Sequence, residues 1–204
     1  MRVILISIIL LVISSVGFAD DAKMAATDRG PEVGAMIPSD LTSIDLSGEV
    51  TNFDGVVGEN GLVLAFVRSV KWCPFCKTQV KDLVSGVSDI NARGYSLVVL
   101  SYDSPKHTKA FAEEYELDFT LLSDRKSEVI DAFGLRNDKY GKFHFANGVP
   151  HPMIFIIGAD KTIQAKLAEQ GYKDRPPVPL IAQTIDGIMA AKQTSSVVLP
   201  VEEQ

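Results

Sequence analysis

Cysteine is scarce in this sequence: the 204 residues contain two, Cys73 and Cys76. So few cysteines exclude a disulfide-rich scaffold. A zinc site would need two further ligands, and His107, His144 and His151 do not stand at ligand spacing. A bridge across so short a loop restrains the unfolded chain little. Reactivity is therefore the better explanation of the pair, and we expect neither a metal nor a cofactor.

Positive charge and long apolar runs are also limited. The formal net charge is −6, and no basic stretch is interleaved with aromatic residues. Nucleic acid is therefore not an expected partner. After the N-terminal segment, no run is long or apolar enough to span a bilayer, which takes about 20 residues.

The N-terminal segment has the features of an export signal. Arg2 supplies a positive charge, the apolar stretch runs to Phe18, and small residues stand at Gly17 and Ala19. We predict a signal peptide over residues 1–19 that is removed after Ala19, with export to the periplasm if the source is a Gram-negative bacterium. The alternative is an uncleaved segment that tethers the chain to the membrane.

The rest of the chain divides into a linker at 20–36, one domain at 37–192 and a flexible tail at 193–204. Residues 41–53 predict a small β-hairpin at the start of the domain. The strands that we predict after it lie at 62–67, 95–100, 119–122, 153–157 and 162–167. We predict four helices. The first lies between the cysteines and Gly94, with the apolar face Val80, Leu83, Val84, Val87 and Ile90, and the second follows Ser104, with the apolar face Ala110, Phe111 and Tyr115. The third runs from Ser123 or Asp124 as far as Gly134, and the fourth follows Pro179, with the apolar face Ile181, Ile185, Ile188 and Met189. Strands that alternate with helices predict an α/β fold with a mixed central sheet, partly parallel, and an antiparallel edge.

The position of the two cysteines suits thiol chemistry. Cys73 follows a buried strand and starts a helix, where unpaired N–H groups and partial positive charge lower a thiol pKa. Pro74 fits the first helical turn. Cys76 lies one turn further on, more shielded, and resolves a mixed disulfide on Cys73. Arg68 and Lys71 add positive charge if they point toward the site.

The stretch from Leu64 to Cys76, with its Trp-Cys-Pro-Phe-Cys motif, resembles the active-site region of the thioredoxin-like superfamily. It is most similar to the redoxin or alkyl-hydroperoxide-reductase/thiol-specific-antioxidant (AhpC/TSA) branch, over residues 37–167. The resemblance implies a thioredoxin-like fold with an N-terminal extension, redox activity at the first cysteine and a cis-proline that faces it. We assign the cis-proline to Pro152 rather than Pro150. The backbone of His151 would then line the site and pair with a substrate chain.

Three side chains near the motif have two interpretations each. Trp72 either shields the dithiol and contacts partners or is a core aromatic. Phe75 stands between the cysteines, where it can contact a substrate. His151 is either an acid–base group or an exposed histidine beside a turn.

The chain departs from the peroxiredoxin pattern at three positions. Phe66 and Val70 stand where peroxiredoxins have a proline and a hydroxyl residue, and Pro152 stands where they have an arginine. Oriented groups of that kind are what fast peroxide chemistry requires. The leading hypothesis is therefore an exported thiol–disulfide oxidoreductase that acts on protein disulfides with an unidentified redox partner. The alternatives are a peroxiredoxin-like antioxidant peroxidase and a non-catalytic thioredoxin-fold binding module.

Overall fold

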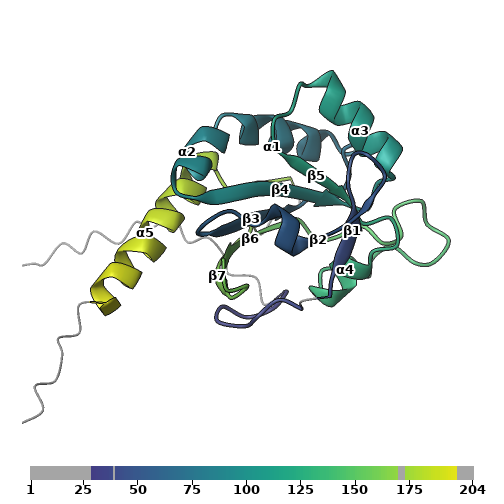
Figure 1. The fold of residues 1–204 in the computed structure, drawn as a ribbon. Helices are drawn as coiled ribbons and strands as arrows, with labels where there is room; N and C mark the ends of the chain where they lie inside the picture. Colours follow the sequence, from purple (N-terminus) through teal and green to yellow (C-terminus); the bar gives the residue numbers. More distant parts are fainter. Residues whose placement is uncertain (1–28, 39, 170–172, 197–204) are drawn as a thin grey trace, which may run out of the picture.

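The computed structural model describes residues 29–38, 40–169 and 173–196 (Figure 1). The predicted signal peptide, most of the linker and residues 197–204 of the tail lie outside this range. Within it, no helix has both the length and the apolar character needed to cross a membrane.

The core of the fold is a seven-stranded mixed sheet in the order β2-β1-β5-β4-β3-β6-β7. The strands are β1 (Thr42–Ile44), β2 (Val50–Asn52), β3 (Gly61–Phe66), β4 (Tyr95–Ser101), β5 (Thr120–Ser123), β6 (Met153–Gly158) and β7 (Ile163–Leu167). The three central strands β3, β4 and β5 are parallel, whereas β6, β7 and the β1–β2 hairpin are antiparallel to their neighbours. The prediction of a mixed α/β sheet is confirmed.

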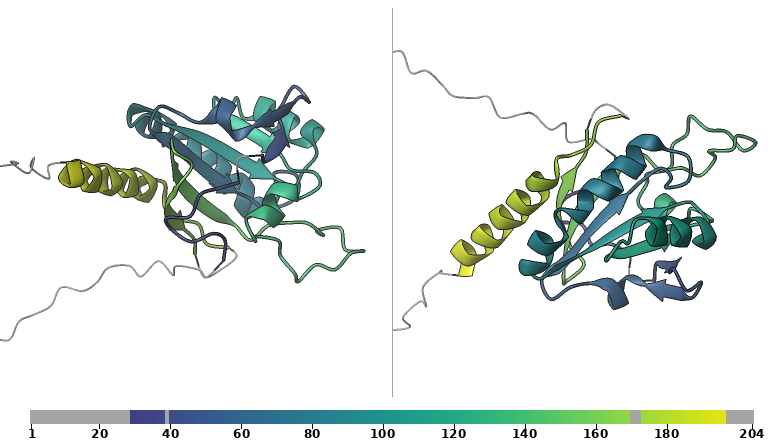
Figure 2. Two further views of the ribbon diagram at one scale, coloured as in Figure 1. Left: turned by 60° about the horizontal axis from the view of Figure 1, so that its bottom comes forward. Right: turned by 90° about the horizontal axis from the view of Figure 1, so that it is seen from above.

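Helices cover both faces of the sheet (Figures 1 and 2). They are η1 (Phe53–Val56), α1 (Pro74–Val84), α2 (Val87–Ala92), α3 (Pro105–Glu114), α4 (Glu128–Ala132) and α5 (Val178–Ser196). Residues of α1, α2, α3 and α5 share one apolar cluster with one side of the strands, and residues of α4 and η1 share the other. Both sides of β3 and β6 are therefore buried, which explains their unbroken apolar sequences.

The single helix predicted between the cysteines and Gly94 is in fact two helices. α1 ends where the N–H groups of Ser85 and Gly86 donate to carbonyls three residues back, at 3.1 and 3.0 Å. A Cβ on Gly86 would collide with the side chain of Val178 at the start of α5. The missing side chain at Gly86 therefore lets the start of α5 lie close to the connection between α1 and α2, a tertiary contact that the apolar pattern does not contain.

The apolar face of α3 also differs from the prediction. Thr108, Phe111 and Ala112 are buried and Tyr115 is half-buried, whereas Ala110 is exposed. The buried residues follow the spacing of one helical stripe, from which Ala110 is offset. The next helix, α4, begins later than predicted, at Glu128 with Ser127 as its N-cap residue. Asp124 still binds its first turn, since its carboxylate accepts the N–H groups of Glu128 and Ile130 at 2.9 and 2.8 Å.

Candidate functional site

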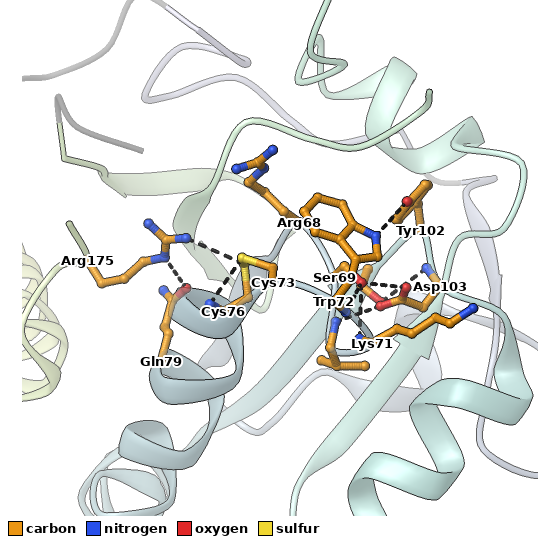
Figure 3. Close-up of a disulfide and its surroundings, with 12 residues drawn as sticks. Arg68, Ser69, Lys71, Trp72, Cys73, Cys76, Gln79, Tyr102, Asp103 and Arg175 are labelled. Carbon is orange, nitrogen blue, oxygen red and sulfur yellow. Dashed lines mark hydrogen bonds between the residues drawn. A yellow bond between two sulfur atoms is a disulfide. The ribbon is translucent and has the colours of Figure 1, made fainter. Parts of the chain in front are cut away.

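The two cysteines lie at the carboxyl end of β3 and the start of α1 (Figure 3). They form a disulfide, with Cα atoms 5.3 Å apart. Cys73 is the N-cap residue of α1, and its Sγ accepts the N–H of Cys76 at 3.3 Å. Pro74 occupies the first helical turn, as predicted. A helix terminus is therefore aimed at the Cys73 sulfur, and both sulfurs are sheltered, since Cys73 is 2% exposed and Cys76 0%.

A buried carboxylate fixes the loop that leads into Cys73. Asp103, just after β4, accepts the Ser69 hydroxyl at 2.8 Å and the Val70 N–H at 2.6 Å. The Ser69 hydroxyl in turn accepts the N–H groups of Lys71 and Trp72 at 3.0 and 3.2 Å. Sequence reasoning missed Asp103. Its position directly after a buried parallel strand was the available signal, because such strand ends meet at one edge of the sheet.

Trp72 is half-buried and tied to a second loop. Its Nε1–H donates to the Tyr102 hydroxyl at 2.9 Å, and that hydroxyl donates to the Phe145 carbonyl at 3.2 Å. Burial raises the pKa of Tyr102, which keeps its proton available for this second bond. The Trp72 ring also meets the Phe145 ring edge to face, with centroids 5.4 Å apart. Trp72 thus forms one wall beside the dithiol.

The two cationic residues upstream of Cys73 do not both face the sulfurs. The Arg68 guanidinium lies 5.2 Å from the centre of the Trp72 ring and donates to the Tyr140 hydroxyl at 2.7 Å. Lys71 is exposed and extends away from the sulfurs (Figure 3). It lines a separate cavity of about 240 Å³ with Trp72, Tyr102, Asp103, Ser104, His107, Arg125 and Phe145. The condition that Lys71 points toward the site is therefore not met.

A cation that the sequence analysis did not single out lies at the dithiol instead. The Nη2 of Arg175, in the connection from β7 to α5, donates to the Cys76 Sγ at 3.5 Å. Its Nε donates to the Gln79 side chain at 2.7 Å. No local pattern marks Arg175, because 99 residues separate it from Cys76.

The segment before β6 differs from the prediction. Every peptide bond in the described residues is trans, including that of Pro152, so the cis-proline assignment is wrong here. The trans form is the intrinsic preference of an X–Pro bond. The N–H of His151 donates to the Leu135 carbonyl at 2.7 Å and is therefore already bonded within the chain. The pairing of the His151 backbone with a substrate chain stays a prediction.

His151 and Pro152 line a cavity of about 360 Å³ with Arg68, Asn137, Lys139 and Tyr140. Burial lowers the pKa of His151, and the positive charges of Arg29 and Arg68 lower it further against the opposing effect of Asp138. At neutral pH the imidazole is therefore uncharged. The cavity brings His151, Pro152 and Arg68 together, and the cysteines are not among its lining residues.

Several aromatic side chains near the site are open to solvent. Phe75, between the cysteines, is 37% exposed. On the loop at 135–150, Phe143 is 99% and Phe145 73% exposed. An aromatic surface of this kind is typical of a contact region for a partner.

Comparison with solved structures identifies the fold. The crystal structure of peroxidoxin BcpB from Mycobacterium tuberculosis superposes with a TM-score of 0.65 at 19% identity, over 78% of this chain and 97% of that one. A mutant of peroxiredoxin 6 from Arenicola marina gives 0.70 at 20% identity, over 86% of this chain and 80% of that one. These similarities establish the thioredoxin-like fold of the peroxiredoxins.

Sequence comparison identifies relatives of the same class. Peroxiredoxin Bcp of Escherichia coli K12 is 30% identical over 120 residues, which is 59% of this chain and 75% of the relative. A putative peroxiredoxin bcp of Haemophilus influenzae is 33% identical over 142 residues, 70% of this chain and 89% of the relative. These relatives are thiol-based oxidoreductases. The model of the AhpC/TSA family matches residues 33–166. The chain therefore belongs to the AhpC/TSA family.

Proposed function

We propose that this chain is a peroxiredoxin-like thiol peroxidase in which Cys73 reacts with hydroperoxides and Cys76 resolves the product. The observation that carries the proposal is the bonded cysteine pair at the start of α1, in a chain whose matched relatives are peroxiredoxins. The comparisons favour this function over the protein-disulfide oxidoreductase that leads the sequence analysis. A Cys73–Cys76 disulfide is the form that such a cycle leaves on the enzyme.

The proposed chemistry has two steps before the enzyme is re-reduced. The Cys73 thiolate attacks the terminal oxygen of a hydroperoxide, the O–O bond breaks, and the alkoxide or hydroxide leaves and takes up a proton. Cys73 is now a sulfenic acid. The Cys76 thiol attacks its sulfur, and the disulfide forms as water leaves. An external dithiol then supplies two electrons and restores both thiols.

The test is hydroperoxide consumption by the purified protein with matched cysteine variants. We expect Cys73→Ser to abolish turnover, because it removes the attacking sulfur. We expect Cys76→Ser to perform the first step and retain a sulfenic acid that dimedone traps and mass spectrometry detects. Turnover that survives in Cys73→Ser, or a trapped sulfenic acid on Cys76, contradicts the assigned roles.

A second candidate function is thiol–disulfide exchange on protein disulfides, and the environment of the site favours it in one respect. The side chains of Phe66 and Val70, at the positions where peroxiredoxins have proline and a hydroxyl residue, are buried and apolar. The hydroxyl of the adjacent Ser69 is bonded to Asp103 and does not replace the missing one. Slow peroxide turnover together with rapid, Cys73-dependent reduction of insulin disulfides would favour exchange over peroxidase activity.

We also propose that the protein acts after export. Arg2 and the apolar segment that ends at Ala19 support this, since they have the pattern of a cleaved signal. The external dithiol would then be a redox protein outside the cytoplasm. Mass spectrometry of the protein from the expressing cell tests the proposal, with a mature N-terminus at Asp20 expected. An intact Met1 terminus in a membrane fraction would support the tethered alternative instead.

A further inference from the structure

The connection from β7 to α5 brings a cationic side chain into contact with one of the two sulfurs. Arg175 reaches across from this connection to α1, where its Nη2 lies 3.5 Å from the Cys76 Sγ (Figure 3). Its Nη1 donates to the Asp174 carbonyl at 2.6 Å, and its Nε donates to the Gln79 side chain at 2.7 Å. These two hydrogen bonds restrain the conformation of the Arg175 side chain and hold its guanidinium in contact with Cys76.

One of the groups that hold Arg175, the side-chain amide of Gln79, is uncharged. Gln79 is 5% exposed and lies on α1, three residues after Cys76, so that its side chain stands on the same side of the helix. A carboxylate in its place would compensate the guanidinium charge, whereas an amide only accepts the hydrogen bond.

The surroundings disfavour the protonated guanidinium but do not remove its charge at neutral pH. Burial and the positive charge of Arg68 lower the pKa of Arg175 to about 10, against the opposing effect of Asp174. A guanidinium with this pKa is still protonated at neutral pH. Because it is half-buried, its attraction for an anion is less screened than in water.

The two sulfurs therefore have different electrostatic partners. The Cys73 Sγ receives the N–H of Cys76 at the helix start, and the Cys76 Sγ receives the guanidinium of Arg175. We infer that Arg175 is a catalytic residue that stabilises the thiolate of Cys76, the resolving cysteine of the proposed function.

This role acts in both halves of the cycle. When a thiolate of the external dithiol attacks the Cys73 sulfur, the Cys73–Cys76 bond breaks and Cys76 leaves as a thiolate beside Arg175. The second thiol of the dithiol then attacks its own mixed-disulfide sulfur and releases the Cys73 thiolate. In the oxidising half, the same charge keeps Cys76 deprotonated for its attack on the Cys73 sulfenic acid. Since the charge of Arg175 stabilises the reduced form of the enzyme, it also raises the reduction potential of the Cys73–Cys76 pair.

The direct test is the pKa of the Cys76 thiol in a Cys73→Ser background, followed by thiolate absorbance at 240 nm against pH. We expect Arg175→Gln to raise this pKa by about one, a tenfold smaller thiolate fraction below the pKa, because an opposite charge is removed. We expect Arg175→Lys to restore part of the effect. Arg93→Gln is the control, since Arg93 is paired with Asp186 on the surface away from the site.

A second variant covers the case in which Arg175→Gln fails to fold. Gln79→Glu keeps the packing and the hydrogen bond but compensates the guanidinium charge, so we expect it to raise the Cys76 pKa in the same direction. With both cysteines present, we expect Arg175→Gln to lower the equilibrium constant for reduction by the dithiol about tenfold, a potential about 30 mV more negative.

The inference is overturned if the Cys76 pKa is unchanged in the variant, if lysine restores nothing, or if Arg93→Gln has an equal effect. None of these measurements uses a peroxide. Failure of the proposed peroxidase function therefore appears in the turnover assay alone, and failure of this inference appears in the thiolate titration alone.

Discussion

Two loops border the dithiol and differ in what holds them. The loop between β3 and α1 is tied to the segment that follows β4 by the buried carboxylate of Asp103, which accepts the Ser69 hydroxyl at 2.8 Å and the Val70 N–H at 2.6 Å. The loop at 135–150 is bonded partly within itself, for example through the Asn137 N–H to the Val149 carbonyl at 2.9 Å, and its Tyr140 and Phe145 accept hydrogen bonds from outside the loop. It projects beyond the sheet (Figure 2) and presents Phe143 to solvent.

The difference separates two requirements of a redox enzyme. The first loop sets the position of Cys73, and its bonds to a buried carboxylate keep the reacting sulfur in place. The second loop offers exposed aromatic surface, which suits contact with a protein partner because aromatic side chains contribute most to such interfaces. We therefore expect changes in the first loop to affect stability and chemistry, and changes in the second to affect partner recognition.

The largest effect is expected from Asp103→Asn. The substitution removes a buried negative charge and leaves a donor facing the Val70 N–H or the Ser69 hydroxyl. We expect the free energy of unfolding to fall by about 2 kcal/mol and peroxide turnover to slow. Chemical denaturation of the reduced and oxidised protein measures the first effect. Asp82→Asn, at an exposed position of α1, is the matched control; equal effects of the two variants would mean that the first loop is not specially fixed.

A smaller effect is expected from Phe143→Ser, and of a different kind. Because this side chain is 99% exposed, we expect the free energy of unfolding to stay within about 0.5 kcal/mol. The KM for a protein dithiol reductant should rise about fivefold, which corresponds to roughly 1 kcal/mol of lost contact. Steady-state kinetics with a protein reductant and with dithiothreitol separate an effect on partner recognition from an effect on the chemistry. A change with dithiothreitol as well would mean that this loop takes part in the chemistry.

The smallest effect is expected from His151→Gln at the base of the second loop. The pKa of His151 is lowered in the folded protein, so the unfolded chain binds a proton first as pH falls through about 6.5. Stability is thus fully present above this pH and is lost below it. We expect the variant to lose less stability than the parent between pH 7 and about 5.5, by thermal denaturation. The same substitution at His107 in α3 controls for the loss of another histidine, and an unchanged pH profile would contradict the prediction.

Much of the fold follows from local patterns in the sequence. The apolar run before the dithiol predicts β3, and the Ser104-Pro105 pair predicts the start of α3. Both the parallel centre and the antiparallel edge of the sheet follow from the order of the elements. The close contact between Gly86 and Val178 could not be predicted in this way, because the two residues lie far apart in the sequence.

The candidate site likewise has features that follow from local sequence and features that depend on contacts between distant residues. Local sequence was enough to predict that Cys73 starts a helix after a buried strand, with Cys76 one turn further on, because propensity and spacing act within a few residues. Three features of the site became visible in the folded chain alone: Asp103 fixes the loop before Cys73, Lys71 extends away from the sulfurs, and Arg175 reaches Cys76. The physical reason is that these contacts join residues up to 99 positions apart. Which of them meet depends on the path of the whole chain through the sheet.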